Sequence, residues 1–266
     1  MYFPPNFDRN RAIELGNLVN QAHDQYECFK NKKPWQLRDG YIMVCEIKYW
    51  SLFGQGEEVE PTIIDHELHE TNKDLLGKHI PMGFVARRDT NAYLVFRGTE
   101  TVGEWISDFK APLVPYFLPN WGKVHKGFHD VYNKCEKSFI DAIGGLDKSL
   151  NLFITGHSLG AALSVLALPE AVSKTSFKQP TLYNFGCPRV GDDTFVQGYN
   201  GLVLSKSFRV VNTSDPVTSV PPPAPLPVLG GAYYSHVDTP VDFTKQNGSI
   251  KGNHIMDTYL TALNQG

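Results

Sequence analysis

The feature that most constrains the fold of this chain is a G-x-S-x-G pentapeptide, residues 156–160, placed between two apolar segments of different kinds. Residues 150–154 form a short apolar run typical of a buried strand, and residues 161–168 form a longer run of helix-compatible apolar residues. This context predicts a tight strand-to-helix turn that holds Ser158 in a sparsely populated backbone conformation. A side chain at Gly156 or Gly160 would collide across such a turn. The pentapeptide therefore predicts a nucleophile elbow, the alternative being a glycine-rich turn capped by a serine.

Length and charge limit the class of protein. The chain has 266 residues and shows no internal repeat, which predicts one domain over residues 1–266. A net charge of -3 with 41% hydrophobic residues provides no broad basic surface and argues against a nucleic-acid partner. No segment approaches the ~20 apolar residues of a membrane span, and charged residues at positions 8–14 stand where a signal peptide needs an apolar block. We therefore expect a soluble chain with no transmembrane segment.

The hydrophobic pattern predicts an α/β fold, in which a mostly parallel central sheet is flanked by helices. Strands and helices alternate after the pentapeptide, as expected for parallel strands joined by crossover helices. The proline-rich stretch 221–229 cannot be a central strand, so we expect either a rigid surface loop or an apolar rim beside the active site. The expected helices cover about 10–29, 161–168, 193–199 and 255–263, and the expected strands 41–47, 82–87, 92–96, 151–155, 181–185 and 207–211, with a polar hairpin turn at 88–91.

A serine hydroxyl is a weak nucleophile near neutral pH, so Ser158 needs a histidine base and an acid that orients it. In α/β-hydrolases these residues follow the serine in the order acid, then histidine. Asp215 is the favoured acid because it comes just after the apolar strand 207–211, whose carboxyl end can deliver a side chain toward the elbow. The alternative role for Asp215 is that of a turn residue before a proline.

The favoured base is His254, which lies in a loop ahead of the final expected helix. His236 is the competitor, but its aromatic surroundings are more typical of a packed histidine in a strand. His125 and His129 precede the serine and therefore do not fit the expected chain order.

Attack on a carbonyl group creates an oxyanion, which needs two preorganised donors. One expected donor is the backbone N–H of Leu159, directly after the nucleophile. The other is expected from the loop after the strand 92–96, where the backbone N–H of Thr99, together with its hydroxyl, can point inward.

An apolar stripe follows the proposed oxyanion donor at helical spacing, with polar residues on the opposite face. Such a stripe is usually core packing, but its position here favours a short helical lid that covers the acyl-binding site and opens onto a lipid surface. The stripe consists of Val102, Trp105, Ile106 and Phe109.

No metal site is expected. The segment 65–70 is rich in histidine and glutamate, yet Glu70 stands where the H-E-x-x-H pattern needs a histidine. The four cysteines have neither C-x-x-C spacing nor disulfide-rich density, which favours free buried thiols.

Taken together, the motifs resemble the class 3, or fungal-type, triacylglycerol lipase family over about residues 80–260. The matching segments are 95–99 with Trp105, 124–128, 156–160, 184–191 and 209–216, which continues to 220–222. The resemblance implies an α/β-hydrolase fold, a triad of Ser158, Asp215 and His254, oxyanion donors from Thr99 and Leu159, and a helical lid. It implies no cofactor. It also favours a secreted mature form, whereas the lack of a signal peptide leaves a cytoplasmic location open.

The predicted function is that of a serine carboxylic-ester hydrolase, foremost a triacylglycerol lipase that releases fatty acids through an acyl-enzyme at Ser158. Its expected partners are an acylglycerol or another long-chain ester and a lipid–water interface. Phospholipase A1, feruloyl-type esterase and acyltransferase activities stay open because one fold hosts them all. The alternative outside enzymology is a lipid-binding module on a lipase scaffold.

Overall fold

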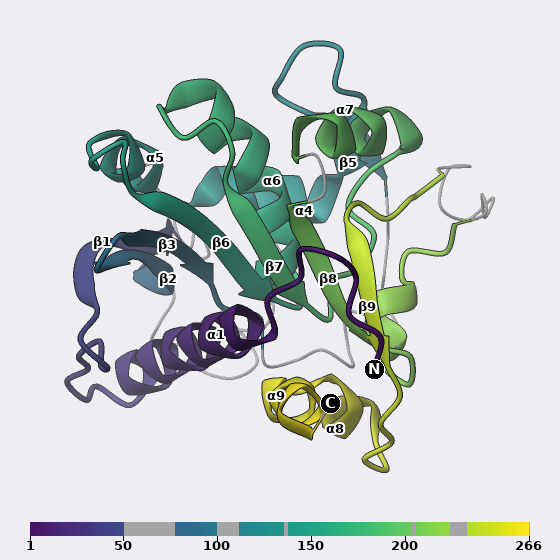
Figure 1. Ribbon diagram of the computed structural model, residues 1–266. Helices are drawn as coiled ribbons and strands as arrows, with labels where there is room; N and C mark the ends of the chain where they lie inside the picture. Colours follow the sequence, from purple (N-terminus) through teal and green to yellow (C-terminus); the bar gives the residue numbers. More distant parts are fainter. Residues whose placement is uncertain (51–77, 100–111, 136–137, 204–205, 224–232, 266) are drawn as a thin grey trace.

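A twisted seven-stranded sheet forms the centre of the structure, and helices cover both of its faces (Figure 1). The computed structural model describes residues 1–50, 78–99, 112–135, 138–203, 206–223 and 233–265. The strands in these ranges are β1 (Ile42–Trp50), β2 (His79–Arg88), β3 (Asn91–Phe96), β4 (Leu113–Pro115), β5 (Lys123–His125), β6 (Asn151–His157), β7 (Thr181–Phe185), β8 (Ser207–Asn212) and β9 (Thr239–Phe243). The helices are α1 (Arg9–Lys30), α4 (Lys126–Lys134), α5 (Ser138–Gly144), α6 (Leu159–Lys174), α7 (Asp193–Val203), the 3₁₀ helix η2 (Pro216–Ser219), α8 (Ile250–His254) and α9 (Met256–Gln265).

The strand order of the sheet is β1-β2-β3-β6-β7-β8-β9. The pairs β1–β2 and β2–β3 are antiparallel, and every pair from β3 to β9 is parallel. The prediction of a mostly parallel sheet is therefore confirmed, as is the hairpin between β2 and β3, where Arg88 pairs with Asn91. Because the carboxyl ends of parallel strands meet at one edge, the residues after β3, β6, β7 and β8 gather there.

Two hydrophobic layers hold the helices on the sheet. On one face, α1 and α9 pack through the side chains of Leu15, Val19 and Tyr259, which are buried against Tyr93 and Phe185 of the sheet. On the other face lie α4, α5, α6 and α7, and α6 is buried along almost its whole length (Figure 1). This burial explains why residues 161–168 are apolar apart from Ser164, whose hydroxyl donates to the backbone carbonyl oxygen of Ala161.

Several elements differ from the sequence prediction. The edge strand β9 went unpredicted because it has only five residues and contains Pro240, and a proline argues against a strand inside a sheet. The predicted final helix is present as α9, but a short helix that was not predicted, α8, comes just before it; Ile255, with extended backbone angles of φ -64° and ψ 147°, separates the two. His254 is the last residue of α8, so the prediction that it lies in a loop was wrong. Two of the cysteines, Cys135 and Cys187, are buried as expected, whereas Cys28 and Cys45 are only half-buried.

Two predicted features lie wholly outside the residues that the structure describes, and the proline-rich stretch 221–229 is described only as far as Pro223. The two features are the apolar stripe Val102, Trp105, Ile106 and Phe109, which was predicted to form a lid, and the histidine-rich segment 65–70. Within the described ranges, no cluster of three or more histidine, cysteine, aspartate or glutamate side chains is arranged to hold a metal ion. A search of the same ranges finds no helix with the length and hydropathy needed to cross a bilayer.

Candidate active site

The predicted elbow is present, and its geometry follows from its two glycines. Ser158 joins β6 to α6 with φ 58° and ψ -125°. This backbone conformation is strained for a residue that carries a side chain. A Cβ atom on Gly156 would lie 2.2 Å from the carbonyl oxygen of Gly160, and one on Gly160 would lie 2.3 Å from that of Arg97. Ser158 occupies the N-cap position of α6, yet its side chain makes no capping hydrogen bond. The hydroxyl is therefore not consumed as a helix cap.

His254 and Asp215 form a buried pair at the same edge of the sheet. The Nδ1 atom of His254 lies 2.6 Å from Oδ2 of Asp215, and both side chains are almost fully enclosed. The other carboxylate oxygen, Oδ1, accepts a hydrogen bond of 3.0 Å from the backbone N–H of Val217 in the first turn of η2, where Asp215 is the N-cap residue. The carboxylate thus has a fixed orientation and in turn orients the imidazole.

Tyr259 is a further partner of this carboxylate that the sequence interpretation missed. Its hydroxyl donates a hydrogen bond to Oδ2 of Asp215 from the buried face of α9. Burial, followed by the nearby Asp215 charge, raises the pKa of Tyr259 well above its ordinary value, so the hydroxyl stays protonated and keeps donating. Its position five residues after His254, facing inward from a helix, was the available signal.

Ser158 and His254 both contact the chain at the end of β7. The backbone N–H of Ser158 donates to the carbonyl oxygen of Phe185 at 3.0 Å. A Cβ atom on the next residue, Gly186, would lie 2.9 Å from Cε1 of His254, so the imidazole packs directly on that glycine. Both Oγ of Ser158 and Nε2 of His254 are buried with no hydrogen-bond partner among the described residues. Buried polar atoms are normally paired, so these two are candidates for reacting groups.

The segment after β3 runs against the elbow. A Cβ atom on Gly98 would lie 2.8 Å from the carbonyl oxygen of His157 and 3.0 Å from Cβ of Ser158. Thr99 follows, and its buried Oγ1 has no hydrogen-bond partner among the described residues. On the other side of Ser158, Leu159 is in the first turn of α6, where backbone N–H groups lack helical acceptors. The structure thus brings both predicted oxyanion donors to the elbow.

The predicted competitor His236 has a different environment. Its Nε2 atom lies 2.8 Å from the carbonyl oxygen of Thr218. Burial, then the charges of Arg209 and Arg189, lowers the pKa of His236 to about 3. It therefore behaves as a packed neutral histidine. His125 caps α4 by accepting from the backbone N–H of Phe128 at 3.3 Å.

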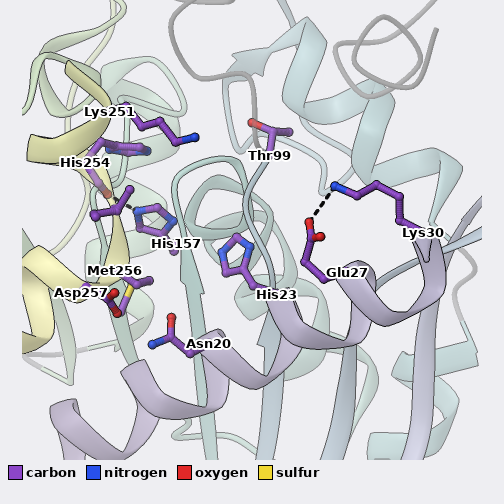
Figure 2. Close-up of a pocket in the computed structure, with 11 residues that line it drawn as sticks. Asn20, His23, Glu27, Lys30, Thr99, His157, Lys251, His254, Met256 and Asp257 are labelled. Atoms are coloured by element: carbon purple, nitrogen blue, oxygen red, sulfur yellow. Dashed lines mark hydrogen bonds and ion pairs between the residues drawn. The ribbon is translucent and has the colours of Figure 1, made fainter. Parts of the chain in front are cut away.

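A pocket of about 490 Å³ opens beside Thr99 and His254. Figure 2 shows that α1 forms one wall of this pocket and that the α8–α9 segment forms the opposite wall. Its lining residues are Asn20, His23, Glu27, Lys30, Thr99, His157, Lys251, His254, Ile255, Met256 and Asp257.

Comparisons with known proteins identify the family of this chain. The model of the family Lipase (class 3) matches residues 93–224, a range that contains β3, the elbow and Asp215 and stops before His254. Residues 93–224 of this chain belong to the class 3 lipase family.

Individual class 3 lipases and related enzymes extend the comparison. The lipase of Rhizomucor miehei is 35% identical over 153 residues, which cover 53% of this chain and 40% of that protein. Phospholipase A1 EG1 of Oryza sativa subsp. indica is 27% identical over 214 residues, which cover 67% and 48%. The chain thus spans less than half the length of these curated relatives.

A solved structure confirms the predicted α/β-hydrolase fold. It is described as a triacylglycerol lipase whose catalytic centre is a serine-protease triad, and it matches this chain with a TM-score of 0.64 at 22% identity. The match covers 89% of this chain and 80% of that chain, so the similarity in fold extends over residues on both sides of the family match.

Proposed function

We propose that this chain is a serine carboxylic-ester hydrolase that cleaves acylglycerols, with Ser158 as nucleophile, His254 as base and Asp215 as the residue that orients the base. The observation that carries the proposal is the presence of an elbow serine and a buried His254–Asp215 pair at one edge of the sheet, with Oγ of Ser158 and Nε2 of His254 both buried and without a hydrogen-bond partner among the described residues.

In the first half-reaction, Nε2 of His254 removes the proton of the Ser158 hydroxyl while Oγ attacks the ester carbonyl carbon. The carbonyl oxygen becomes an oxyanion, which accepts hydrogen bonds from the backbone N–H groups of Leu159 and Thr99. Asp215 stabilises the imidazolium that forms. The tetrahedral intermediate then collapses, the C–O bond to the alcohol breaks, and His254 gives its proton to the departing alcohol oxygen.

In the second half-reaction a water molecule replaces the alcohol. His254 removes one proton from this water, the hydroxide attacks the acyl carbon, and the bond between Ser158 and the acyl group breaks as Oγ recovers the proton. The products are a free fatty acid and the original enzyme. All proton transfers use the same imidazole, so no further cofactor enters the proposed steps.

Triacylglycerol is the foremost proposed substrate, met at a lipid–water interface. The relative from Rhizomucor miehei is named a lipase, and the matched structure is described as a triacylglycerol lipase. The apolar stripe of Val102, Trp105, Ile106 and Phe109 supports a long acyl chain rather than a small polar aromatic ester, since a lid of this composition would offer an apolar cover.

The charged lining of the pocket favours a second candidate, phospholipase A1. Lys30 and Lys251 bring ammonium groups, and Glu27 and Asp257 bring carboxylates, to the pocket that His254 also lines. Lys30 is paired with Glu27 at 2.8 Å, whereas Lys251 is exposed on α8. A lysophospholipid leaving group carries a phosphate that an ammonium group can bind, and a diacylglycerol leaving group carries no charge.

The test is the initial rate on p-nitrophenyl esters of increasing chain length, on emulsified triacylglycerol and on phosphatidylglycerol vesicles, for wild type and Ser158→Ala. We expect a preference for long chains, a rise in rate at the solubility limit of the substrate, and loss of activity in the variant. Activity on triacylglycerol that equals or exceeds the phospholipid rate supports the first candidate. A phospholipid rate that is higher, and that falls in Lys251→Gln but not in the distant control Lys148→Gln, supports the second. Full activity of Ser158→Ala would refute both.

A further inference from the structure

His23 belongs to helix α1, more than a hundred residues away in sequence from the elbow, yet it borders the same pocket as Thr99 and His254. In Figure 2 its ring rises from α1 into the pocket next to His157. The ring centroids of His23 and His157 are 5.9 Å apart. None of the steps proposed above uses His23, so its position calls for a separate explanation.

His23 forms a hydrogen bond with the backbone of Gly98, the residue just before Thr99. The N–H of Gly98 donates a hydrogen bond to Nε2 of His23 at 3.4 Å. This contact holds the peptide plane between Arg97 and Gly98, which comes just after the last ladder bond of the strand, from the Arg97 N–H to the carbonyl oxygen of Met82 at 2.9 Å. His23 thus supplies the hydrogen-bond acceptor for the first backbone N–H after the end of the strand ladder.

The next peptide plane, between Gly98 and Thr99, is held by a different side chain. The Nη1 atom of Arg97 donates to the carbonyl oxygen of Gly98 at 2.7 Å, and Nε of Arg97 donates to that of Pro81 at 2.8 Å. The guanidinium also stacks over the ring of Tyr26, 3.7 Å from its centroid. The carbonyl oxygen of Gly98 and the N–H of Thr99 belong to the same rigid plane. Fixing that oxygen therefore fixes the direction of the proposed oxyanion donor.

Glycine is needed at position 98 because a Cβ atom would press on the elbow, but glycine also has the greatest backbone freedom. The two planes on either side of Gly98 must both be fixed if the Thr99 N–H is to be held in one direction. Arg97 fixes one plane and His23 the other. Helix α1 supplies both supports, since it carries His23 and also Tyr26, on which the guanidinium of Arg97 rests.

The hydrogen bond from Gly98 requires a neutral imidazole with its proton on Nδ1. Burial, followed by the Arg97 charge, lowers the pKa of His23 to about 4. Among the other facing groups, His254 also opposes a charge on His23, whereas Asp24 and Glu27 of α1 favour one. His157 stays neutral too, since burial and then the neighbouring His254 and His23 hold its pKa well below the ordinary value. The acceptor state of His23 is therefore maintained over the neutral pH range.

We propose that His23 is a positioning residue for the oxyanion hole, in which its Nε2 atom fixes the Arg97–Gly98 peptide so that the backbone N–H of Thr99 is directed at the developing oxyanion. The inference rests on the proposed function, because it supposes an oxyanion at this place. It predicts that losing the acceptor weakens binding of the transition state and leaves binding of the substrate unchanged.

The experiment compares His23→Gln, His23→Asn and His23→Leu with wild type on a soluble p-nitrophenyl ester. The amide oxygen of glutamine can approach the position of Nε2, whereas asparagine is too short and leucine has no acceptor. We expect kcat to fall about tenfold or more in the asparagine and leucine variants with KM unchanged, and to return to within about threefold of wild type in the glutamine variant. Asn17→Leu, on the exposed part of the same helix, is the control and keeps the wild-type rate.

Inhibition by an alkylboronic acid, which forms a tetrahedral adduct with a catalytic serine, separates positioning from general destabilisation. The inhibition constant should weaken by the same factor as kcat/KM across the three variants, whatever their melting temperatures. The proposal for His23 would be overturned if all three variants kept the wild-type kcat, or if the glutamine variant were as impaired as the leucine variant, while Ser158→Ala remained inactive. Activity retained in Ser158→Ala would instead refute the proposed function itself.

Discussion

At the scale of residues, the candidate site combines one hydrogen bond, between Nδ1 of His254 and Oδ2 of Asp215, with two atoms that lack partners among the described residues, Oγ of Ser158 and Nε2 of His254. His254 Nδ1 is bound to Asp215, and this leaves Nε2 as the ring atom available to the Ser158 hydroxyl. The hydroxyl is available because it makes no capping hydrogen bond to α6. A serine and a histidine that act as one unit should give losses that do not multiply.

Ser158→Ala and His254→Ala test this unit. Each single variant should lose at least about 10⁴-fold in kcat, and the double variant should lose little more than either, because removing one member already disables the other. The measurement is kcat on a soluble p-nitrophenyl ester, with circular dichroism to confirm folding. Losses that multiply in the double variant would mean that the two residues act independently.

Tyr259→Phe tests the support behind Asp215. Removing the hydroxyl deletes a hydrogen bond to a buried carboxylate, which is worth about 1.5–3 kcal/mol, and we expect kcat to fall about tenfold with KM little changed. Tyr199→Phe is a matched control, since its buried hydroxyl lies 3.0 Å from Ser207 and away from the pair. If both variants lost kcat to the same degree, a specific role for Tyr259 would be untenable.

At the scale of elements, much of this arrangement could be predicted from periodicity and glycine placement. Helix α1, the β2–β3 hairpin and the succession of parallel strands follow from apolar spacing. The neighbours of the site could not be predicted, because they come together only in the folded chain. Nothing local indicates that His23 meets Gly98 or that Tyr259 meets Asp215. Helix α8 was missed because it has only five residues and contains Gly252, so no helical period of apolar residues marks it.

Gly160→Ala tests the contact between β3 and α6. The added Cβ atom would lie 2.3 Å from the carbonyl oxygen of Arg97, which is backbone and cannot move aside cheaply. We expect a loss of about 1–3 kcal/mol in unfolding free energy together with a large loss of kcat. Gly201→Ala in α7 is the control, because no atom lies within 4 Å of its added Cβ. That variant should be neutral or slightly more stable in urea denaturation. Equal stability of the two variants would show that the close approach is absent.

At the scale of the whole molecule, the parallel strands bring residues from widely separated parts of the chain to one edge. Asp238, just before β9, connects that strand to β7 and β8 through side-chain hydrogen bonds. Its carboxylate accepts from the side chains of Asn184 at 3.0 Å and of Ser207. Burial raises the pKa of Asp238 from 3.8 to about 6, against the opposing effect of these hydrogen bonds and of Arg209. The folded protein therefore binds this proton more tightly than the unfolded chain does.

This shift predicts a pH dependence of stability with a definite sign. Between about pH 4 and pH 6 the folded state holds more protons at Asp238 than the unfolded state, so this residue makes stability fall as pH rises through that window. Asp238 is partly exposed, and solvent screening reduces its contribution, so we expect a change in unfolding free energy on the order of 2 kcal/mol across this window. Asp238→Asn should remove this component. The test is the difference in unfolding free energy between wild type and Asp238→Asn at pH 4 and pH 7. A difference that does not change with pH would contradict the assignment.

The central claim is that Ser158 carries the acyl group during turnover. The most direct measurement is a rapid acid quench of the wild-type enzyme with a long-chain p-nitrophenyl ester, followed by mass analysis of the peptide that contains residues 156–160. We predict a burst of p-nitrophenol that matches the amount of enzyme, and an acyl group attached to Ser158 that is absent in His254→Ala. Turnover without a burst, with the acyl group on another residue or on none, would contradict the account.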